Sequence, residues 1–224
     1  TVPEVEQTER HGVYIVGYTD GTFGPSRSMT RSEAAAIFAR LLAEKNGDTI
    51  STAANTKFAD IPAHAWYSGY VKYLSNNGIT YGKSKTIFAP NDAITRAEFT
   101  TMAVRFFDVY GDGDAEIMEQ FSGFNDVSSG YWAAEYIKYA ALHGWINGYG
   151  DGSFHADREI NRAEVVTIVN RLLGREADED YIADNLRKLN TFPDVSRKHW
   201  AYYAVMEAAN AHTAVLGENE SWSK

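Results

Sequence analysis

Apolar residues recur at helical spacing in three stretches of the chain that share one pattern. The stretches are MTRSEAAAIFARLL (residues 29–42), ITRAEFTTMAVRFF (94–107) and INRAEVVTIVNRLL (160–173), and they lie 65 and 66 residues apart. In each, the second residue is a good helix N-cap and a Glu follows three positions later, which together form a capping box. Such a repeat at a nearly fixed period predicts three equivalent amphipathic helices.

A second helical pattern also occurs three times. Its start is marked by Phe and Trp eight residues apart with Asp at the third place, in FADIPAHAW (58–66), FNDVSSGYW (124–132) and FPDVSRKHW (192–200). Apolar residues at helical spacing continue after each Trp. Gly78 and Gly144 stand where the first two runs end, and glycine is the usual residue just past a helix C-terminus. We expect a helix after each Trp, the last over about residues 199–212.

A short loop with a fixed length connects the two kinds of helix. It reads GYTDGTF (17–23), GKSKTIF (82–88) and GYGDGSF (148–154), always with six residues from Gly to Phe. The Asp-Gly pairs at 20–21 and 151–152 predict tight turns with positive φ, in minimal hairpins. We therefore expect only minor β structure, in short hairpins.

The order of the elements predicts a closed assembly. The chain starts in the loop of one repeat and ends after the Trp helix of another, so the end of the chain can supply what the first repeat lacks. We expect a single, mainly α module over residues 1–224, a pseudo-threefold assembly of three helix-loop-helix repeats in which the C-terminal helix completes the N-terminal repeat. A solenoid would instead leave two uncovered ends. The predicted repeats are 11–45 plus 192–212, 58–109 and 124–174, with connectors 46–57, 110–123 and 175–191, the last with an additional helix.

The composition is that of a folded, acidic chain. Of its 224 residues 44% are hydrophobic, and 21 Lys and Arg against 30 Asp and Glu give a formal charge of −9 without a basic run. This excludes nucleic acid and an anionic membrane surface as main partners, since both are bound by clustered Lys and Arg. No apolar run reaches the roughly 20 residues of a membrane span, and the first residues show no signal-peptide core. The lack of cysteine excludes disulfides and thiolate chemistry.

Taken together, Phe-x-Asp…Trp, Gly-Tyr-x-Asp-Gly-x-Phe and (Ile/Met)-Thr-Arg-(Ala/Ser)-Glu resemble the S-layer homology domain, over about residues 13–212. The resemblance implies a non-catalytic module outside the cell, on the surface of bacteria. It implies anchoring to the cell wall through a secondary cell-wall polysaccharide, often one that carries pyruvate ketals. No cofactor is implied.

The residue after each helix cap is an arginine: Arg31, Arg96 and Arg162. At the first helical position a cation opposes the helix macrodipole, at a cost of a few tenths of a kcal/mol. Such an arginine is either solvated or paired with a nearby carboxylate, or it binds a ligand. Free N–H groups at a helix N-terminus, beside a guanidinium fork, suit a carboxylate such as that of a pyruvate ketal. The threefold recurrence favours the ligand-binding interpretation, with an arginine at the base of each groove between adjacent repeats.

Two further sets of repeated residues are candidates for the same grooves. Trp66, Trp132 and Trp200 either stack on sugar rings or are core residues at the start of a buried helix, and the sequence does not decide between these. Gly17, Gly82 and Gly148 meet a backbone requirement or let a ligand approach the backbone closely. The repeated Asp60, Asp126 and Asp194 are expected to cap a helix or to brace the neighbouring loop. Because GKSKTIF departs from the loop pattern, the sequence argues against three equivalent sites, and one or two functional grooves would be an ordinary outcome.

Catalytic and metal chemistry find no support in the sequence. The common nucleophile, phosphate-loop and zinc-protease motifs do not occur, and the six histidines share no ligand-like spacing with carboxylates. We therefore expect no catalytic and no metal-binding residue. The alternative function is a structural or self-assembly domain of a surface layer, which would act through protein–protein contacts, including contacts with its own copies.

Overall fold

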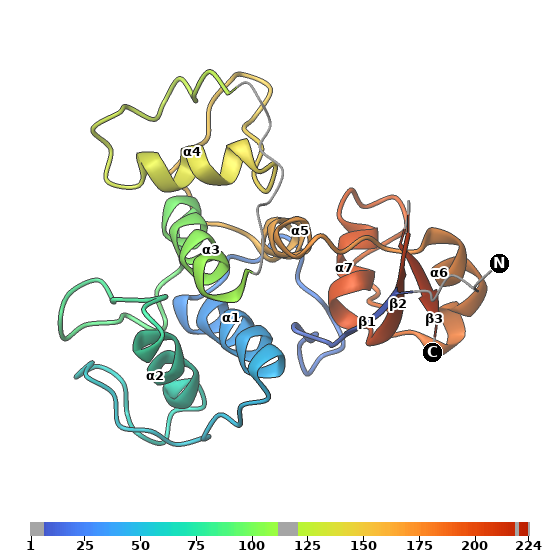
Figure 1. Cartoon of the computed structure of the whole chain (residues 1–224), viewed down its shortest axis with the longest axis horizontal. Coiled ribbons are helices and arrows are strands. Elements are labelled where there is room, and N and C mark those ends of the chain that lie inside the picture. The colour runs from blue at the N-terminus through green and yellow to red at the C-terminus, as the bar shows by residue number, and fades with distance from the viewer. Residues whose placement is uncertain (1–6, 112–120, 218–219, 224) are drawn as a thin grey trace. The chain divides into compact units, whose positions relative to one another are not determined.

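The computed structural model describes residues 7–111, 121–217 and 220–223. Most of the predicted connector 110–123 and residues 1–6, 218–219 and 224 of the predicted module lie outside the described residues. The three helices with the arginine are α1 (Arg31–Asn46), α3 (Arg96–Tyr110) and α5 (Arg162–Leu173), and those after the tryptophans are α2 (Ser68–Asn76), α4 (Ala134–Leu142) and α7 (Tyr202–Ala209) (Figure 1). The third connector holds α6 (Glu179–Asn185) and a 3-10 turn (Leu186–Lys188). The predicted mainly α fold and the additional helix are confirmed.

Capping boxes start α1 and α3 as the sequence predicts. The Thr30 hydroxyl accepts a 3.2 Å hydrogen bond from the Glu33 amide, and the Glu33 carboxylate accepts one of 2.8 Å from the Thr30 amide. Thr95 and Glu98 repeat this exchange at 3.2 and 3.1 Å. Each box satisfies two amides that a helix start otherwise leaves without an intrahelical partner. The structural role predicted for these two glutamates is thus confirmed.

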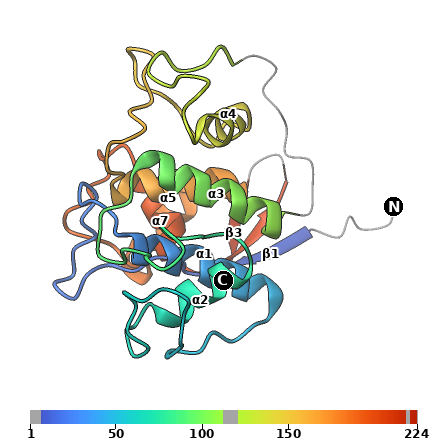
Figure 2. The same cartoon turned by 90° about the vertical axis from the view of Figure 1, so that its left-hand side faces the viewer.

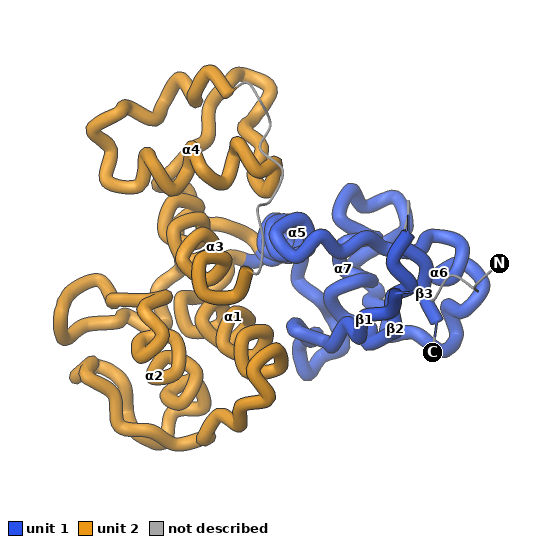
Figure 3. Tube along the Cα trace, viewed as in Figure 1, with its two compact units in different colours: residues 1–27, 162–224 blue, residues 28–161 orange. Residues whose placement is uncertain are grey.

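The described chain divides into two compact units, one of residues 1–27 and 162–224 and one of residues 28–161 (Figure 3). In the second unit, α1 packs on α2 and α3 packs on α4, while α1 and α3 lie side by side (Figures 1 and 2). The ring of Phe38 on α1 contacts Phe99 and Phe106 on α3, with centroids 5.3 and 4.9 Å apart. All three rings are fully buried, and each stabilises the unit by about 1.5–3 kcal/mol.

A closed ring of three backbone hydrogen bonds joins equivalent residues of the three repeats. The Met29 amide donates to Ile160, the Ile160 amide to Ile94, and the Ile94 amide back to Met29, at 2.9–3.0 Å. All three side chains are fully buried. The ring lies within residues 28–161, and because each residue has the same role toward the next, it gives the predicted pseudo-threefold relation a local structural basis.

In the first unit, the end of the chain completes the N-terminal repeat. α5 packs on α7, as α1 packs on α2. The ring of Phe192 lies 5.3 Å from that of Phe23, and the Asp194 carboxylate accepts hydrogen bonds from the amides of Phe23 and Gly24. These contacts correspond to those of Phe58 and Asp60 with the loop of the second repeat.

The last helix is shorter than predicted, and a small sheet replaces its end. The sequence predicts a helix over about 199–212, but α7 stops at Ala209 and His212 opens a strand. The strands β1 (Gln7–His11), β2 (His212–Leu216) and β3 (Ser221–Ser223) form an antiparallel sheet in the order β1-β2-β3. Asn210 is already extended, at φ −128° and ψ 119°, because residues 212–216 exchange helical hydrogen bonds for pairing with β1.

The predicted Asp-Gly turns form without regular strands beside them. The amides of Tyr18 and Tyr149 donate to Thr22 and Ser153 at 2.7 and 2.8 Å, and Gly21 and Gly152 have the expected positive φ, 82° and 80°. The minor β structure of the described residues therefore lies mostly in the sheet rather than at these turns. Among the helices described, none has both the length and the apolar character needed to cross a membrane.

Candidate functional site

Arg31, the first residue of α1, is buried and held on three sides. Only 4% of the residue is exposed. Its Nε–H donates to the backbone carbonyl of Phe88 at 2.7 Å, and its guanidinium carbon lies 5.0 Å from the centre of the Phe88 ring. Its Nη1 forms a 3.0 Å ion pair with Oε1 of Glu98. The carbonyl dipole and the carboxylate offset the unfavourable position of the cation at a helix N-terminus.

The other two arginines are held in the same way. Nε of Arg96 donates to the Phe154 carbonyl and Nε of Arg162 to the Phe23 carbonyl, both at 2.8 Å. Nη2 of each donates to a second loop carbonyl, of Asn147 and of Val16 respectively. Arg31 is different, since among the described residues its Nη2 has no such carbonyl partner. The pairing with a nearby carboxylate, one of the alternatives from the sequence, is found for Arg31, whereas the bonds of all three arginines to loop carbonyls were missed by sequence reasoning.

The helix N-termini are not free, contrary to the reasoning from sequence. The first amides of α1, α3 and α5 donate to the carbonyls of Asp92, Arg158 and Arg27, at 2.8–3.0 Å. The second amides also donate to loop carbonyls. The expectation of unpaired N–H groups that would bind an anion is therefore wrong, because neighbouring loops already supply acceptors. Any anion would have to be bound by side chains.

A pocket of about 90 Å³ in the unit of residues 28–161 brings three of the predicted site residues together. Arg31, Gly82 and Trp132 all line it, and each comes from a different repeat. The remaining lining residues belong to the segment that follows α2 and to α3: Ile79, Thr80, Tyr81, Glu98, Thr101, Met102 and Arg105. The pocket therefore has cationic, aromatic and backbone elements at one place.

Arg105 and Thr101 add polar chemistry that the sequence did not single out. The Arg105 guanidinium donates to the Tyr136 hydroxyl at 3.1 and 3.3 Å and lies over the Tyr81 ring, 4.8 Å from its centre. The Thr101 hydroxyl is buried and has no hydrogen-bond partner among the described residues. A buried hydroxyl without a partner is costly, and this one lies on a helix that lines the pocket.

The three tryptophans are exposed. Trp66, Trp132 and Trp200 are 53%, 58% and 65% accessible to solvent. The interpretation as core residues is therefore wrong. Their large apolar faces remain on the surface at equivalent positions, of which that of Trp132 lies at the pocket.

The repeated glycines are required by close packing. A Cβ at Gly17, Gly82 or Gly148 would come within 2.5 Å of the ring of Phe192, Phe58 or Phe124. Each of these rings is the Phe that precedes the repeated Asp. The predicted backbone requirement holds at Gly82, whose φ is +80°, whereas Gly17 and Gly148 have no positive φ and are required by the close approach of the Phe ring.

The repeated aspartates brace the neighbouring loops, which is one of the two roles predicted for them, the other being to cap a helix. Asp60 accepts hydrogen bonds from the amides of Phe88 and Ala89, and Asp126 from those of Phe154 and His155. Ala89 and His155 have positive φ, 58° and 55°, which is rare for residues other than glycine. Each carboxylate thus holds a strained peptide in place and fixes the carbonyl to which the arginine donates.

Sequence reasoning missed a group of titratable residues because it judged spacing along the chain. His11, Glu207, His212 and Glu220 share no regular spacing, yet the structure places their ligand-type atoms within 4.8 Å of one another. The signal was absent from the sequence, since the strand pairing of β1 with β2 joins residues about 200 positions apart.

Comparison with known protein families identifies one family for all three repeats. The model of the S-layer homology domain matches residues 3–35, 57–100 and 123–166. The chain is 34% identical over 218 residues to cell surface glycoprotein 1 of Acetivibrio thermocellus, covering 94% of this chain and 9% of that protein. It is 30% identical to the cellulosome-anchoring protein of the same organism, over 97% of this chain and 46% of that protein.

A third relative is an S-layer protein of Bacillus licheniformis, 29% identical over 69% of this chain and 17% of that protein. The chain thus spans less than half the length of these relatives. The family and its relatives agree with the predicted location at the bacterial cell surface or cell wall. With three matched copies that cover more than half of its residues, this chain belongs to the S-layer homology domain family.

Proposed function

We propose that this chain is a non-catalytic anchoring module that binds an anionic secondary cell-wall polysaccharide. The ligand is a polymer whose sugars carry pyruvate ketals, and the site is the pocket lined by Arg31, Gly82 and Trp132. The observation that carries the proposal is the convergence of these three residues, one from each repeat, in one pocket.

The chemistry of the pocket suits a sugar with a carboxylate. A guanidinium nitrogen donates a charge-assisted hydrogen bond to a carboxylate. In Arg31, Nε and Nη1 are engaged by Phe88 and Glu98, but Nη2 does not engage the loop carbonyl that the other two arginines bind. The exposed ring of Trp132 offers an apolar face to a pyranose ring.

The pocket favours an anionic ligand through its own charges, although the chain as a whole is acidic. The whole chain carries −9 and repels a polyanion at long range, whereas the pocket has two guanidinium groups against one carboxylate, that of Glu98. Glu98 already serves the capping box and the ion pair with Arg31. Glycoside hydrolysis usually needs two carboxylates, and Glu98 has no second carboxylate beside it among the residues that line this pocket, which favours binding over hydrolysis of the polysaccharide.

Sedimentation with purified bacterial cell wall tests the proposal. Trp132→Ala removes the exposed ring and should release most of the protein from the wall. Ile87→Ala, an exposed apolar residue that does not line the pocket, is the matched control and should bind as the wild type does. If Trp132→Ala keeps full binding while its circular dichroism is unchanged, the pocket is not the binding site.

Self-assembly through protein contacts is the second candidate, because the three exposed tryptophans present apolar surface at equivalent positions. It predicts concentration-dependent oligomers in sedimentation velocity without any polysaccharide. Alanine at all three positions would then abolish the oligomers.

A further inference from the structure

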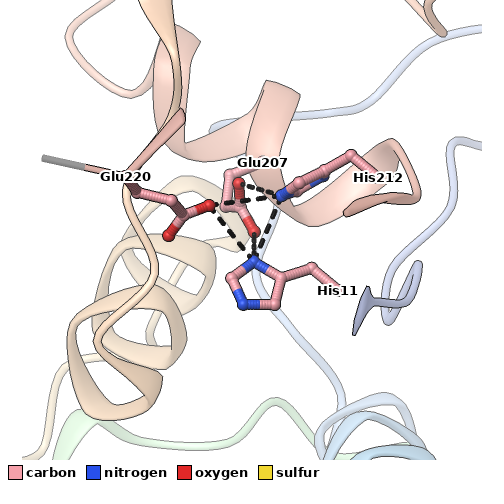
Figure 4. Close-up of side chains that lie close together, drawn as sticks. All are labelled: His11, Glu207, His212 and Glu220. Atoms are coloured by element: carbon pink, nitrogen blue, oxygen red, sulfur yellow. Dashed lines mark hydrogen bonds and ion pairs between the residues drawn. The ribbon is translucent and has the colours of Figure 1, made fainter. Parts of the chain in front are cut away.

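Two histidines and two glutamates converge in the interior of the unit of residues 1–27 and 162–224 (Figure 4). His11 ends β1, His212 begins β2, Glu207 lies on α7 and Glu220 precedes β3. Their side chains are 0–5% exposed. Figure 4 shows all four pointing toward a common centre, and none of them lines the binding pocket.

The distances fit four ligands around one ion. Nδ1 of His11 and Nε2 of His212 lie 3.1 Å apart, and Oε1 of Glu220 lies 3.3 Å from both. The Glu207 oxygens lie 3.2 Å from His11 and 3.3 Å from His212. Zinc binds imidazole nitrogen and carboxylate oxygen at about 2.0–2.2 Å, so the ligand atoms of a tetrahedral site lie about 3.3 Å apart.

Outer contacts orient the ligands toward the centre. Nδ1–H of His212 donates to the Asn210 carbonyl at 2.9 Å, which in the neutral ring leaves the lone pair of Nε2 facing the cluster. The second oxygen of Glu220 accepts from the Glu176 amide at 3.0 Å. The ring of Trp222 stacks on His212, with centroids 3.8 Å apart. A backbone carbonyl that receives the outer N–H of a histidine is a usual companion of a metal site.

When the His212 ring is neutral, hydrogen bonds do not satisfy every acceptor of the cluster. With His212 in this form, Nδ1 of His11 faces both carboxylates and the other ring. Oε1 of Glu220 also accepts from the indole N–H of Trp222 at 3.1 Å. Oε2 of Glu207 is fully buried and has no hydrogen-bond donor among the described residues. An unpaired buried carboxylate oxygen is costly.

The local charge favours a cation at the centre. Two buried carboxylates give −2 when the rings are neutral. The buried Arg175 acts on His11 as a nearby positive charge, and it offsets at most one of these two negative charges.

We propose that His11, Glu207, His212 and Glu220 bind one divalent transition-metal ion, zinc by preference, in a closed structural site. Two imidazoles and two carboxylates, with their ligand atoms within 4.8 Å of one another, are a donor set that suits zinc. Calcium takes six to eight oxygen ligands and magnesium an octahedral set, which this cluster does not offer. Four buried protein ligands leave no open position for a substrate, so the ion is structural.

The site joins the two ends of the chain. Its ligands come from β1, α7, β2 and the residue before β3, so one ion ties the N-terminal strand to the C-terminal helix and sheet. The chain has no cysteine, and an ion at this place would do what a disulfide does in other extracellular modules. Metal bound only by the native state shifts unfolding to higher temperature.

Metal binding by the tag-free chain tests the proposal. The protein is stripped with a chelator, then titrated separately with zinc, calcium and magnesium, while bound metal and the thermal midpoint are measured. We expect one zinc per chain and a rise in midpoint of several degrees, with no rise for calcium or magnesium. Cobalt should give the intense visible absorption of a tetrahedral site. Less than half an equivalent of zinc, or an unchanged midpoint in the loaded protein, would show that protons and not a metal hold the cluster.

Two variants locate the ion. Glu207→Gln and His212→Gln keep the side-chain size and should weaken zinc binding at least 100-fold. Glu44→Gln and His64→Gln change the same residue types at exposed positions outside the cluster and should bind as the wild type does. If a cluster variant does not fold, the cobalt spectrum of the wild type still decides. Equal zinc affinity in folded cluster and control variants would contradict the assignment.

Discussion

The Nε–H of Arg31 donates a 2.7 Å hydrogen bond to the backbone carbonyl of Phe88. The two residues belong to different repeats, and the same bond recurs from Arg96 to Phe154 and from Arg162 to Phe23. The repeated arginine is therefore first a link between a helix start and a neighbouring loop. In the proposed binding site, Nη2 of Arg31 is the nitrogen that would meet a ligand, because it is not engaged by a loop carbonyl.

Arg31→Ala should destabilise the protein by about 2–4 kcal/mol. The Phe88 carbonyl loses its buried donor and Glu98 loses its ion pair, and unpaired buried groups of this kind carry a large penalty. Urea unfolding followed by circular dichroism measures the change. Arg187→Ala, at an exposed position, should change stability by less than about 0.5 kcal/mol. Equal effects of the two substitutions would mean that the Arg31 contacts contribute nothing.

Gly82→Ala should cost clearly more stability than Gly21→Ala. Both glycines have φ near +80°, so both substitutions carry the backbone strain of about 1–2 kcal/mol. A Cβ at Gly82 would also meet the Phe58 ring at 2.5 Å and the Ile87 carbonyl at 2.6 Å, whereas nothing lies within 4 Å at Gly21. We expect about 3 kcal/mol or more at position 82. Similar losses in thermal unfolding would show that the loop moves aside.

Ala89→Gly should stabilise the protein by about 0.5–1 kcal/mol. Ala89 has a φ of 58°, and glycine removes the strain of that conformation while costing some backbone entropy in return. Ala59→Gly is the control, because Ala59 in the same repeat is not in the left-handed region, and it should be neutral or destabilising. A loss of stability in Ala89→Gly would mean that the alanine methyl contributes more than its strain costs.

The contribution of Asp126 should disappear at low pH. Burial works to raise the pKa of Asp126, but hydrogen bonds from the Phe154 and His155 amides outweigh it, and the pKa lies below its ordinary value. A carboxyl group with a lower pKa in the folded state stabilises the protein above the unfolded-state pKa, about 3.8, and loses this effect as pH falls through the folded-state value. The stability difference between wild type and Asp126→Asn should be largest near pH 7 and shrink below pH 4. A difference independent of pH would contradict this.

Local signals in the sequence predict most of the helical fold. Thr95 and Glu98 define the start of α3, Gly78 and Gly144 mark the ends of α2 and α4, and the repeat itself indicates how the end of the chain completes the first repeat. These features depend on residues a few positions apart, where propensity and capping decide the structure.

Long-range pairings could not be predicted in the same way. The pairing of β1 with β2, the ion pair of Arg31 with Glu98 and the cluster around His11 join residues that no local pattern relates. The exposure of Trp132 was equally open, since a Trp at the start of a helix is compatible with a core or a surface position. Only the tertiary arrangement decides such cases.

Calorimetric titration with one polysaccharide in two forms tests the central claim most directly. The wall polysaccharide is used with its pyruvate ketals and after their mild acid removal, against the wild type and Trp132→Ala. We expect the wild type to bind the pyruvylated form at least about tenfold more tightly, a difference of about 1.4 kcal/mol, and Trp132→Ala to lose most of its affinity for that form. Equal affinity of the wild type for both forms would contradict a pocket that recognises a carboxylate through Arg31.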